Sequence, residues 1–383
     1  MSSREAEEWI ARGIELGEQD RFTEAVEAYD RATALDPTNA EAWALKGGAL
    51  ADCERMEEAL VAYERALALD PDEAALWAFK GNALAELGRS DEALDATERA
   101  LALDPTDATA WLIKGAMLTE LERSDEALAA YDHVLALDPD ETDAILGKAD
   151  ALLELERFDE ALAVYERALE FDPNDESALT GKGDALDALD RHDEALTAYD
   201  RALSIAADDI DALTGKGDAL ANLERYDEAL VVYEQALALD DEHIWAWMGK
   251  GDALAGLERH NEALAAYDRA LKLDPEDERA LSGRAIALVD LRRDADALAT
   301  LDRVLAKSAD EPFLWTLKAD SLVRQDRLPE ALEAYTRATK LDERNAWAWL
   351  GRAACLQALG RGQEAQAAEQ RARELGAVIT HEE

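Results

Sequence analysis

The chain repeats one pattern of apolar and polar positions every 34 residues. In the stretch 74–107, Trp77, Gly81 and Leu84 are spaced as on one face of a helix, and a second helical spacing follows after Arg89. The pattern therefore predicts two helices per unit, the first over positions 1–14 and the second ending near a proline that cannot continue a helix. The prolines on this grid are Pro37, Pro71, Pro105, Pro139, Pro173 and Pro275.

Eleven blocks of this length fit the chain without an insertion or deletion. A repeat array is one continuous element, so we expect a single array over residues 6–379 with short tails at 1–5 and 380–383 and no separate catalytic domain. The blocks begin at Ala6, Ala40, Ala74, Ala108, Thr142, Glu176, Ile210, Ile244, Glu278, Pro312 and Ala346.

Seven positions carry the repeat. Position 4 is large and apolar, position 8 is Gly or Ala, position 11 is Leu, position 20 is Ala, position 24 is usually Tyr, position 27 is Ala or Val, and position 32 is often Pro. A large residue beside a small one lets neighbouring helices approach to about 8–10 Å. The turn carries an Arg in every block, which complements the preceding helix dipole, and Ser90 is predicted to cap the second helix of its block.

This set of positions resembles the tetratricopeptide repeat, and the resemblance covers essentially the whole chain. It implies an all-α fold, an α-solenoid in which about eleven helix-turn-helix units stack as a right-handed superhelix. The first helices of the units are then expected to line a concave groove. It also implies a non-enzymatic scaffold that binds peptides or segments of partner proteins in this groove.

Two features depart from the family pattern. Position 7 is Lys or Arg in every block, and eight of the eleven lysines of the chain stand there. The placement favours a structural ion pair with a neighbouring turn, and a basic ladder for an anionic ligand is the alternative. Six blocks have a glycine at position 6, which costs about 1 kcal/mol of helix propensity and indicates a close approach of backbone or ligand. These glycines are Gly147, Gly181, Gly215, Gly249, Gly283 and Gly351.

Two blocks differ from the rest. The second helix of the last block places Gln366, Glu369 and Arg373 where the other blocks have Leu, Tyr and Leu, which predicts a C-terminal cap with a polar outer face. Block 278–311 has Leu301 in the Tyr place and Ala309 in the Pro place. It is either a soft joint or neutral drift.

The formal net charge is −47, from 87 acids and 40 bases. Binding to nucleic acid requires a basic surface, so this charge argues against nucleic acid and against anionic membranes as partners. The excess of Asp and Glu over Lys resembles proteins of extremely halophilic archaea, in which molar salt screens the self-repulsion. An acidic scaffold from a mesophile is the alternative.

No catalytic or cofactor chemistry is evident in the sequence. Gly-Lys-Gly at 181–183 lies inside a predicted helix, so it is not a phosphate-binding loop, and the histidines lack metal-ligand spacing. The sequence therefore predicts no enzyme, cofactor or metal site. Two distant cysteines, Cys53 and Cys355, no apolar signal region at the N-terminus and no long apolar stretch predict a cytoplasmic protein.

The groove is expected to be lined by positions 2, 5, 9 and 12 of the first helices. Its candidate residues are acidic in the early blocks and aromatic later, and the identity of the partner and the oligomeric state stay open. The alternative function is a substrate-recruiting or regulatory subunit of an enzyme complex whose catalysis lies on another chain. The candidates at position 2 are Glu7, Glu41, Asp143, Asp211, Trp245, Arg279, Phe313 and Trp347, and those at position 9 are Asp150, Asp184, Asp218, Asp252 and Asp320.

Overall fold

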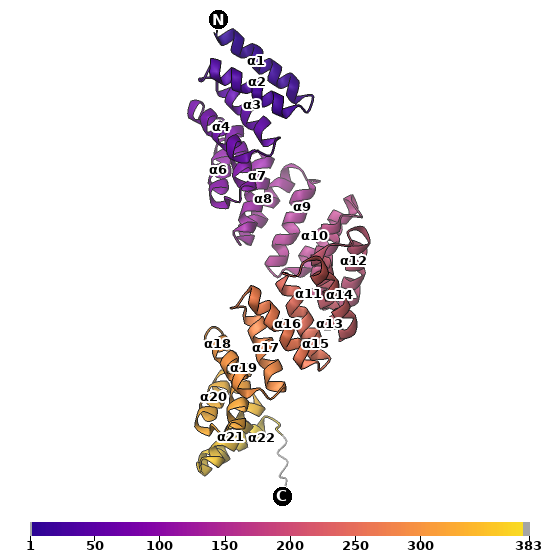
Figure 1. Cartoon of the computed structure of the whole chain (residues 1–383), viewed down its shortest axis with the longest axis vertical. Helices are drawn as coiled ribbons and strands as arrows, with labels where there is room; N and C mark the ends of the chain where they lie inside the picture. The colour runs from indigo at the N-terminus through magenta and orange to yellow at the C-terminus, as the bar shows by residue number, and fades with distance from the viewer. Residues whose placement is uncertain (1, 378–383) are drawn as a thin grey trace. The chain divides into compact units, whose positions relative to one another are not determined.

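The computed structural model describes residues 2–377, and these form 22 α-helices and no strand (Figure 1). Met1, the last two residues of block 346–379 and the predicted tail 380–383 lie outside the described residues. Each block contributes one odd-numbered and one even-numbered helix, so the prediction of an all-α solenoid is confirmed.

The first helices of the blocks fill positions 1–13 in most blocks, one residue fewer than predicted. Their bounds are α1 Ser2–Gly17, α3 Ala40–Ala51, α5 Ala74–Glu86, α7 Ala108–Glu120, α9 Thr142–Glu154, α11 Glu176–Ala188, α13 Ile210–Asn222, α15 Ile244–Gly256, α17 Glu278–Asp290, α19 Pro312–Arg324 and α21 Ala346–Ala358.

The second helices fill positions 17–30 in most blocks. Their bounds are α2 Phe22–Leu35, α4 Met56–Leu69, α6 Ser90–Leu103, α8 Ser124–Leu137, α10 Phe158–Phe171, α12 His192–Ile205, α14 Tyr226–Leu239, α16 His260–Leu273, α18 Asp294–Leu305, α20 Leu328–Leu341 and α22 Gly362–Glu374.

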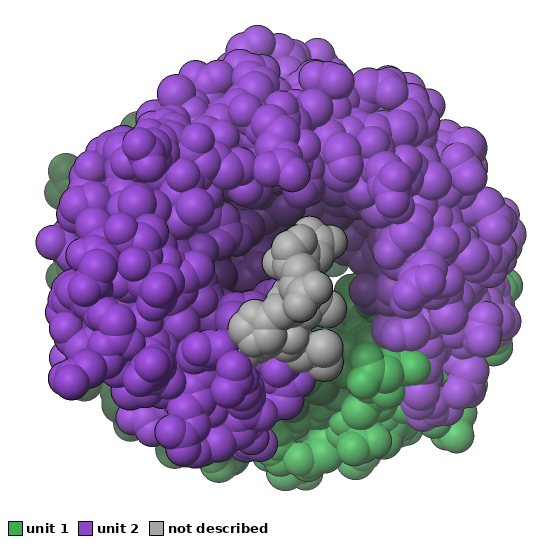
Figure 2. Space-filling model, turned by 90° about the horizontal axis from the view of Figure 1, so that it is seen from below, with its two compact units in different colours: residues 1–190 green, residues 191–383 purple. Residues whose placement is uncertain are grey.

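The contacts divide the chain into two compact units, residues 1–190 and 191–383, coloured separately in Figure 2. Within each unit, every helix packs against the next helix along the chain, and each first helix also contacts the first helix of the next block. This is the packing of a solenoid, in which a repeat buries its apolar face mainly against its neighbours.

The junction between blocks is fixed by a cap and a tryptophan. The side chain of Asp107, the last residue of its block, accepts a hydrogen bond from the backbone nitrogen of Ala110 at 3.0 Å and so satisfies an otherwise unpaired N–H of α7. The indole nitrogen of Trp111 donates to the carbonyl oxygen of Pro105 at 3.0 Å. Pro105 and Trp111 therefore hold the end of one block to the first helix of the next.

The turn inside each block has a different cap from the one that the sequence predicts. Arg89, and not Ser90, is the residue before α6, and its guanidinium binds both carboxylate oxygens of Glu92 at 2.7 Å. Ser90 is the first helical residue, and its hydroxyl donates to Glu120 of the next block at 2.6 Å. The prediction for Ser90 was wrong because a hydroxyl beside a neighbouring carboxylate binds it in place of the backbone.

The core is made of small residues interleaved with tyrosines. The position-20 alanines from Ala25 to Ala331 have no exposed surface, and Tyr165 and Tyr233 are at most 1% exposed. In block 278–311, Leu301 is fully buried in the Tyr place and α18 has 12 residues where most second helices have 14. In α22, Gln366 and Arg373 are exposed, as the predicted cap requires.

Candidate functional site

The tyrosine at position 24 lies in a slot between two consecutive first helices. Tyr165 packs against Gly181 of the next block, and a Cβ atom added to Gly181 would lie less than 3.0 Å from three atoms of the tyrosine side chain. The hydroxyl of Tyr165 donates to Oδ1 of Asp150, at position 9 of its own block, at 2.5 Å. The glycine at position 6 is therefore explained by the tyrosine ring, which needs the space that a side chain would occupy.

The same arrangement recurs along the chain. In four blocks an aspartate at position 9 accepts a hydrogen bond from the tyrosine hydroxyl of its own block, and the following block has glycine at position 6. The described hydrogen bonds are Tyr165 to Asp150, Tyr233 to Asp218, Tyr267 to Asp252 and Tyr335 to Asp320.

The pKa values of these tyrosines are raised. Burial, followed by the negative charge of Asp150, raises the pKa of Tyr165 well above its ordinary value, and burial with Asp218 does the same to the pKa of Tyr233. Burial also raises the pKa of Tyr63 to about 12, with a smaller effect from Asp52. The buried phenols therefore stay neutral and donate hydrogen bonds far into the alkaline range.

The tight slot leads to a stability prediction of unusual sign. Alanine normally stabilises a helix relative to glycine by about 1 kcal/mol, and Gly48→Ala, with no atom within 4 Å of the added Cβ, should show this gain. Gly181→Ala should instead destabilise the protein by about 1–3 kcal/mol, because its Cβ would overlap the ring of Tyr165. Urea unfolding in molar KCl, followed by circular dichroism, measures both. Equal gains in the two variants would contradict the slot, and the penalty should vanish when Tyr165→Ala is combined with Gly181→Ala.

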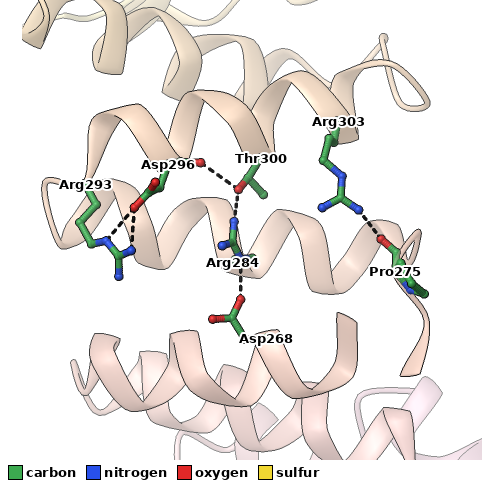
Figure 3. A network of polar contacts seen from close by, with 7 residues as sticks. All are labelled: Asp268, Pro275, Arg284, Arg293, Asp296, Thr300 and Arg303. Carbon is green, nitrogen blue, oxygen red and sulfur yellow. Dashed lines mark hydrogen bonds and ion pairs between the residues drawn. The ribbon is translucent and has the colours of Figure 1, made fainter. Parts of the chain in front are cut away.

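The cations at position 7 form ion pairs across blocks. The ammonium of Lys148 lies 2.6 Å from Asp132 of the preceding block, and that of Lys250 lies 2.9 Å from Glu234. Arg284 binds Asp268 at 2.6 Å and also the hydroxyl of Thr300, as Figure 3 shows. The same spacing of 16 residues recurs from Lys46 to Lys318, so the structural interpretation of position 7 is confirmed for these blocks.

Tryptophans at position 4 reinforce these pairs. The ammonium of Lys250 lies 5.5 Å from the ring centre of Trp247, and that of Lys318 lies 5.1 Å from the ring centre of Trp315, both within cation–π range. Each of these lysine–tryptophan pairs lines a shallow pocket between two consecutive blocks, of about 340 Å³ beside Trp247 and about 480 Å³ beside Trp315. Because their position-7 cations are already paired with carboxylates, these pockets are weak candidates for an anion site.

The predicted groove positions differ in exposure. At position 2, Trp245, Phe313 and Trp347 are 58%, 54% and 77% exposed, although all three are large and aromatic. They stand in the first turns of α15, α19 and α21, all within residues 191–383. We call these three residues the aromatic row. Arg279, at position 2 of the intervening block, is also exposed.

The acidic candidates at position 2 are exposed as well, and those at position 9 are exposed or half-buried. Position 5 behaves differently. Met248 has no exposed surface, and Ile10 and Thr180 are each 8% exposed. The prediction that position 5 lines an open groove is wrong for these blocks. Positions 2 and 5 are three residues apart, which is less than one full helical turn, so position 5 is rotated toward the neighbouring helices. The exposed acids at position 2 are Glu7, Glu41, Asp143 and Asp211.

Two further kinds of site receive no support from the geometry. Among residues 2–377, no group of three or more His, Cys, Asp or Glu side chains is placed to hold a metal ion. None of the described helices combines the length and the apolar character that crossing a membrane requires.

The repeated helix pairs define a class of protein, the α-solenoids built from helix-turn-helix repeats. Family models of the tetratricopeptide repeat match most of the chain, and the chain belongs to the tetratricopeptide repeat family. Proteins of this family are generally scaffolds for protein interactions. One model matches residues 10–74, 80–142, 214–278 and 316–377, and a second matches 118–185, 152–219 and 254–320.

Solved structures include several relatives in fold. A tetratricopeptide repeat protein from Parabacteroides merdae is 16% identical, with a TM-score of 0.52, covering 66% of this chain and 99% of that one. The MamA protein is 24% identical over 43% of this chain and 90% of its own, with a TM-score of 0.41. YrrB, described as a TPR protein with an unusual peptide-binding site, is 27% identical over 50% of this chain and 98% of its own, with a TM-score of 0.39. No curated protein matches the chain in sequence.

Proposed function

We propose that this protein is a non-enzymatic scaffold that holds a protein or peptide partner on the surface formed by positions 2 and 9 of its first helices. The observation that carries the proposal is the aromatic row. Trp245, Phe313 and Trp347 stay more than half exposed in a chain whose other tryptophans are half-buried. Exposed aromatic residues of this kind are frequent binding hot spots.

The fold itself does not require an aromatic residue at position 2. Seven of the eleven blocks have Glu, Asp, Ala, Ser or Thr there, and they form the same helix pairs. The aromatic row is therefore better explained by binding than by packing. The acids at position 2 of the earlier blocks form a second candidate surface, whose contribution to affinity weakens as salt screens it.

A pull-down experiment tests this function. The triple variant Trp245→Ala, Phe313→Ala, Trp347→Ala should lose the partners that the unaltered protein recovers at molar KCl, because each hot-spot residue typically contributes about 2 kcal/mol or more. The helical circular dichroism signal should not change, since all three side chains are exposed. Each recovered partner is then purified and its affinity for both proteins is measured by calorimetry.

A matched control uses equally exposed apolar residues of the second helices. Val61, Leu137 and Val231 are 57%, 48% and 55% exposed, and their triple alanine variant should bind as the unaltered protein does. Full binding by the aromatic variant would overturn the proposal for the aromatic row and direct attention to the acidic surface. Stoichiometric recovery of an enzyme would favour the recruiting-subunit function over a scaffold that acts alone.

The cytoplasmic location is part of the same proposal and has one chemical support. Cys53 and Cys355 are both free thiols, as expected in a reducing compartment.

A further inference from the structure

The surface formed by positions 2 and 9 of the first helices already holds one cation, the guanidinium of Arg279. Its guanidinium lies 2.8 Å from Oδ2 of Asp252, on the preceding first helix, and 5.9 Å from the ring centre of Trp245. Oδ1 of the same aspartate accepts a hydrogen bond from the hydroxyl of Tyr267 at 2.6 Å. The tyrosine therefore fixes the carboxylate, and the second oxygen and the tryptophan ring are left to bind the guanidinium.

The geometry is a property of the repeat. Trp245 and Asp252 are seven residues apart on α15, at positions 2 and 9, and Arg279 comes from position 2 of the next first helix. Because α15 and α17 are direct neighbours, the cation reaches across one helix–helix contact. Seven residues are nearly two turns, so both groups lie on one side of α15.

Two blocks further on, the same arrangement lacks its cation. Phe313 and Asp320 stand at positions 2 and 9 of α19, and the hydroxyl of Tyr335 donates to Oδ1 of Asp320 as Tyr267 does to Asp252. The residue that corresponds to Arg279 is Trp347 on the neighbouring helix α21. No cation among residues 2–377 forms an ion pair with Asp320, whose side chain is half-buried. Phe313, on the same helix, is 54% exposed, and Trp347, on the neighbouring helix, is 77% exposed.

We propose that Phe313, Asp320 and Trp347 form a cation cage that binds a guanidinium or ammonium group of a basic partner segment. The proposal rests on the scaffold function above and names its partner class, a peptide with arginine or lysine. Arg279 is the internal example of the ligand. A net charge of −47 makes a basic segment the complementary partner, and two rings with one carboxylate give the site selectivity for a cation over a neutral apolar group.

The position-9 aspartates of the earlier blocks lack the two rings of this cage. For Asp150, position 2 is Asp143 in its own block and Ser177 in the next block, so neither position supplies an aromatic ring. Asp218 has Asp211 in its own block and a single ring, Trp245, in the next block. Asp150 is therefore a matched control. It accepts the same tyrosine hydrogen bond as Asp320 but has no ring at position 2 of its own helix.

The test uses small probes on the full chain. The protein is expressed with 5-fluorotryptophan and studied by fluorine NMR in 1 M KCl. The signals of Trp347 and Trp245 are assigned by replacing each with phenylalanine. N-acetyl-arginine methylamide is the cationic probe, and N-acetyl-citrulline methylamide is its neutral isostere. The arginine probe should shift the Trp347 signal saturably at millimolar concentration, and the citrulline probe should not.

Three variants sharpen the result. Asp320→Asn keeps a hydrogen-bond acceptor for Tyr335 and removes the negative charge, so the affinity for the arginine probe should fall about tenfold. Asp150→Asn should leave the response of Trp347 unchanged. Arg279→Ala empties the internal site, so the Trp245 signal should begin to respond to the probe. An equal response to both probes, or an unaltered response in Asp320→Asn, would overturn the cage.

The two proposals can fail separately. If the aromatic triple variant loses its partner but the arginine probe does not bind, the scaffold stands and the cation cage is wrong. If the probe binds with the expected charge dependence but the triple variant keeps its partner, the site binds a cation, but the partner docks elsewhere and the proposed partner class is wrong.

Discussion

The protein should lose its helical structure when salt is removed. We expect the far-UV circular dichroism signal to fall progressively on dialysis below about 0.15 M KCl, with the largest loss near 0.01 M. The charge on the chain is the reason. With 87 acids and 40 bases, the ion pairs at position 7 and in the turns leave a net charge of −47 without a counter-charge.

The length scale of the repulsion sets the expected salt range. One net charge per about 420 Å² of accessible surface places neighbouring net charges about 20 Å apart. The Debye length is about 8 Å at 0.15 M, so their repulsion is screened there, and it is about 30 Å at 0.01 M. The core opposes this repulsion with many alanines, which bury little area at about 25 cal/mol per Å².

A variant with fewer charges provides the control. Six exposed acids at position 18 of their blocks, in the second helices, form no ion pair with any residue that the structure describes, and the chain itself has Asn261 at this position. Their replacement by Asn or Gln reduces the net negative charge from −47 to −41. The salt concentration at which half of the helical signal is lost should therefore fall. Unchanged helicity and melting temperature in dilute buffer would contradict the halophilic interpretation. The six acids are Glu57, Asp91, Asp125, Asp159, Asp193 and Asp227.

Alkaline pH should unfold the protein even at molar salt. Burial raises the pKa of several tyrosines above the ordinary value of 10, and the shift is largest in five, where a neighbouring aspartate is a further cause. In the unfolded chain these phenols lose their protons near pH 10, while the folded protein retains them. Their contribution to stability is therefore fully present below pH 10 and is lost as the pH rises. The five are Tyr63, Tyr165, Tyr233, Tyr267 and Tyr335.

The expected loss of stability at alkaline pH is comparable with the whole free energy of unfolding of a typical protein. Each retained proton lowers stability by about 1.4 kcal/mol per pH unit, or about 7 kcal/mol per unit for five tyrosines, against a typical total of about 5–15 kcal/mol. Unfolding should therefore occur between about pH 10 and 12. Helix content and tyrosinate absorbance at about 295 nm should change together. Tyr165→Phe removes one of the five groups and should make the pH dependence less steep. Independent ionisation near pH 10 with intact helices would contradict the prediction.

The sequence determined the architecture almost completely. The 34-residue spacing placed the helix pairs, because a helix face recurs every three to four residues and Trp, Gly and Leu at positions 4, 8 and 11 define that face. It also predicted the ion pairs of the position-7 cations. A lysine between two buried positions reaches a neighbouring helix wherever its side chain turns, so Lys148 and Lys250 needed no knowledge of the partner atom.

The tertiary structure alone decided which polar groups pair. Asp150 and Tyr165 are 15 residues apart, and Gly181 is 16 residues further on, so no helical period connects them. Their meeting depends on the separation and rotation of three helices, which the pattern of apolar positions leaves free. The same reason explains why Ser90 binds Glu120 and not its own helix. It also explains why Asp252 binds Arg279, while Asp320 is paired with no cation among residues 2–377. Helical periodicity fixes the face on which a side chain lies, and only the packing of neighbouring helices fixes the group that it meets.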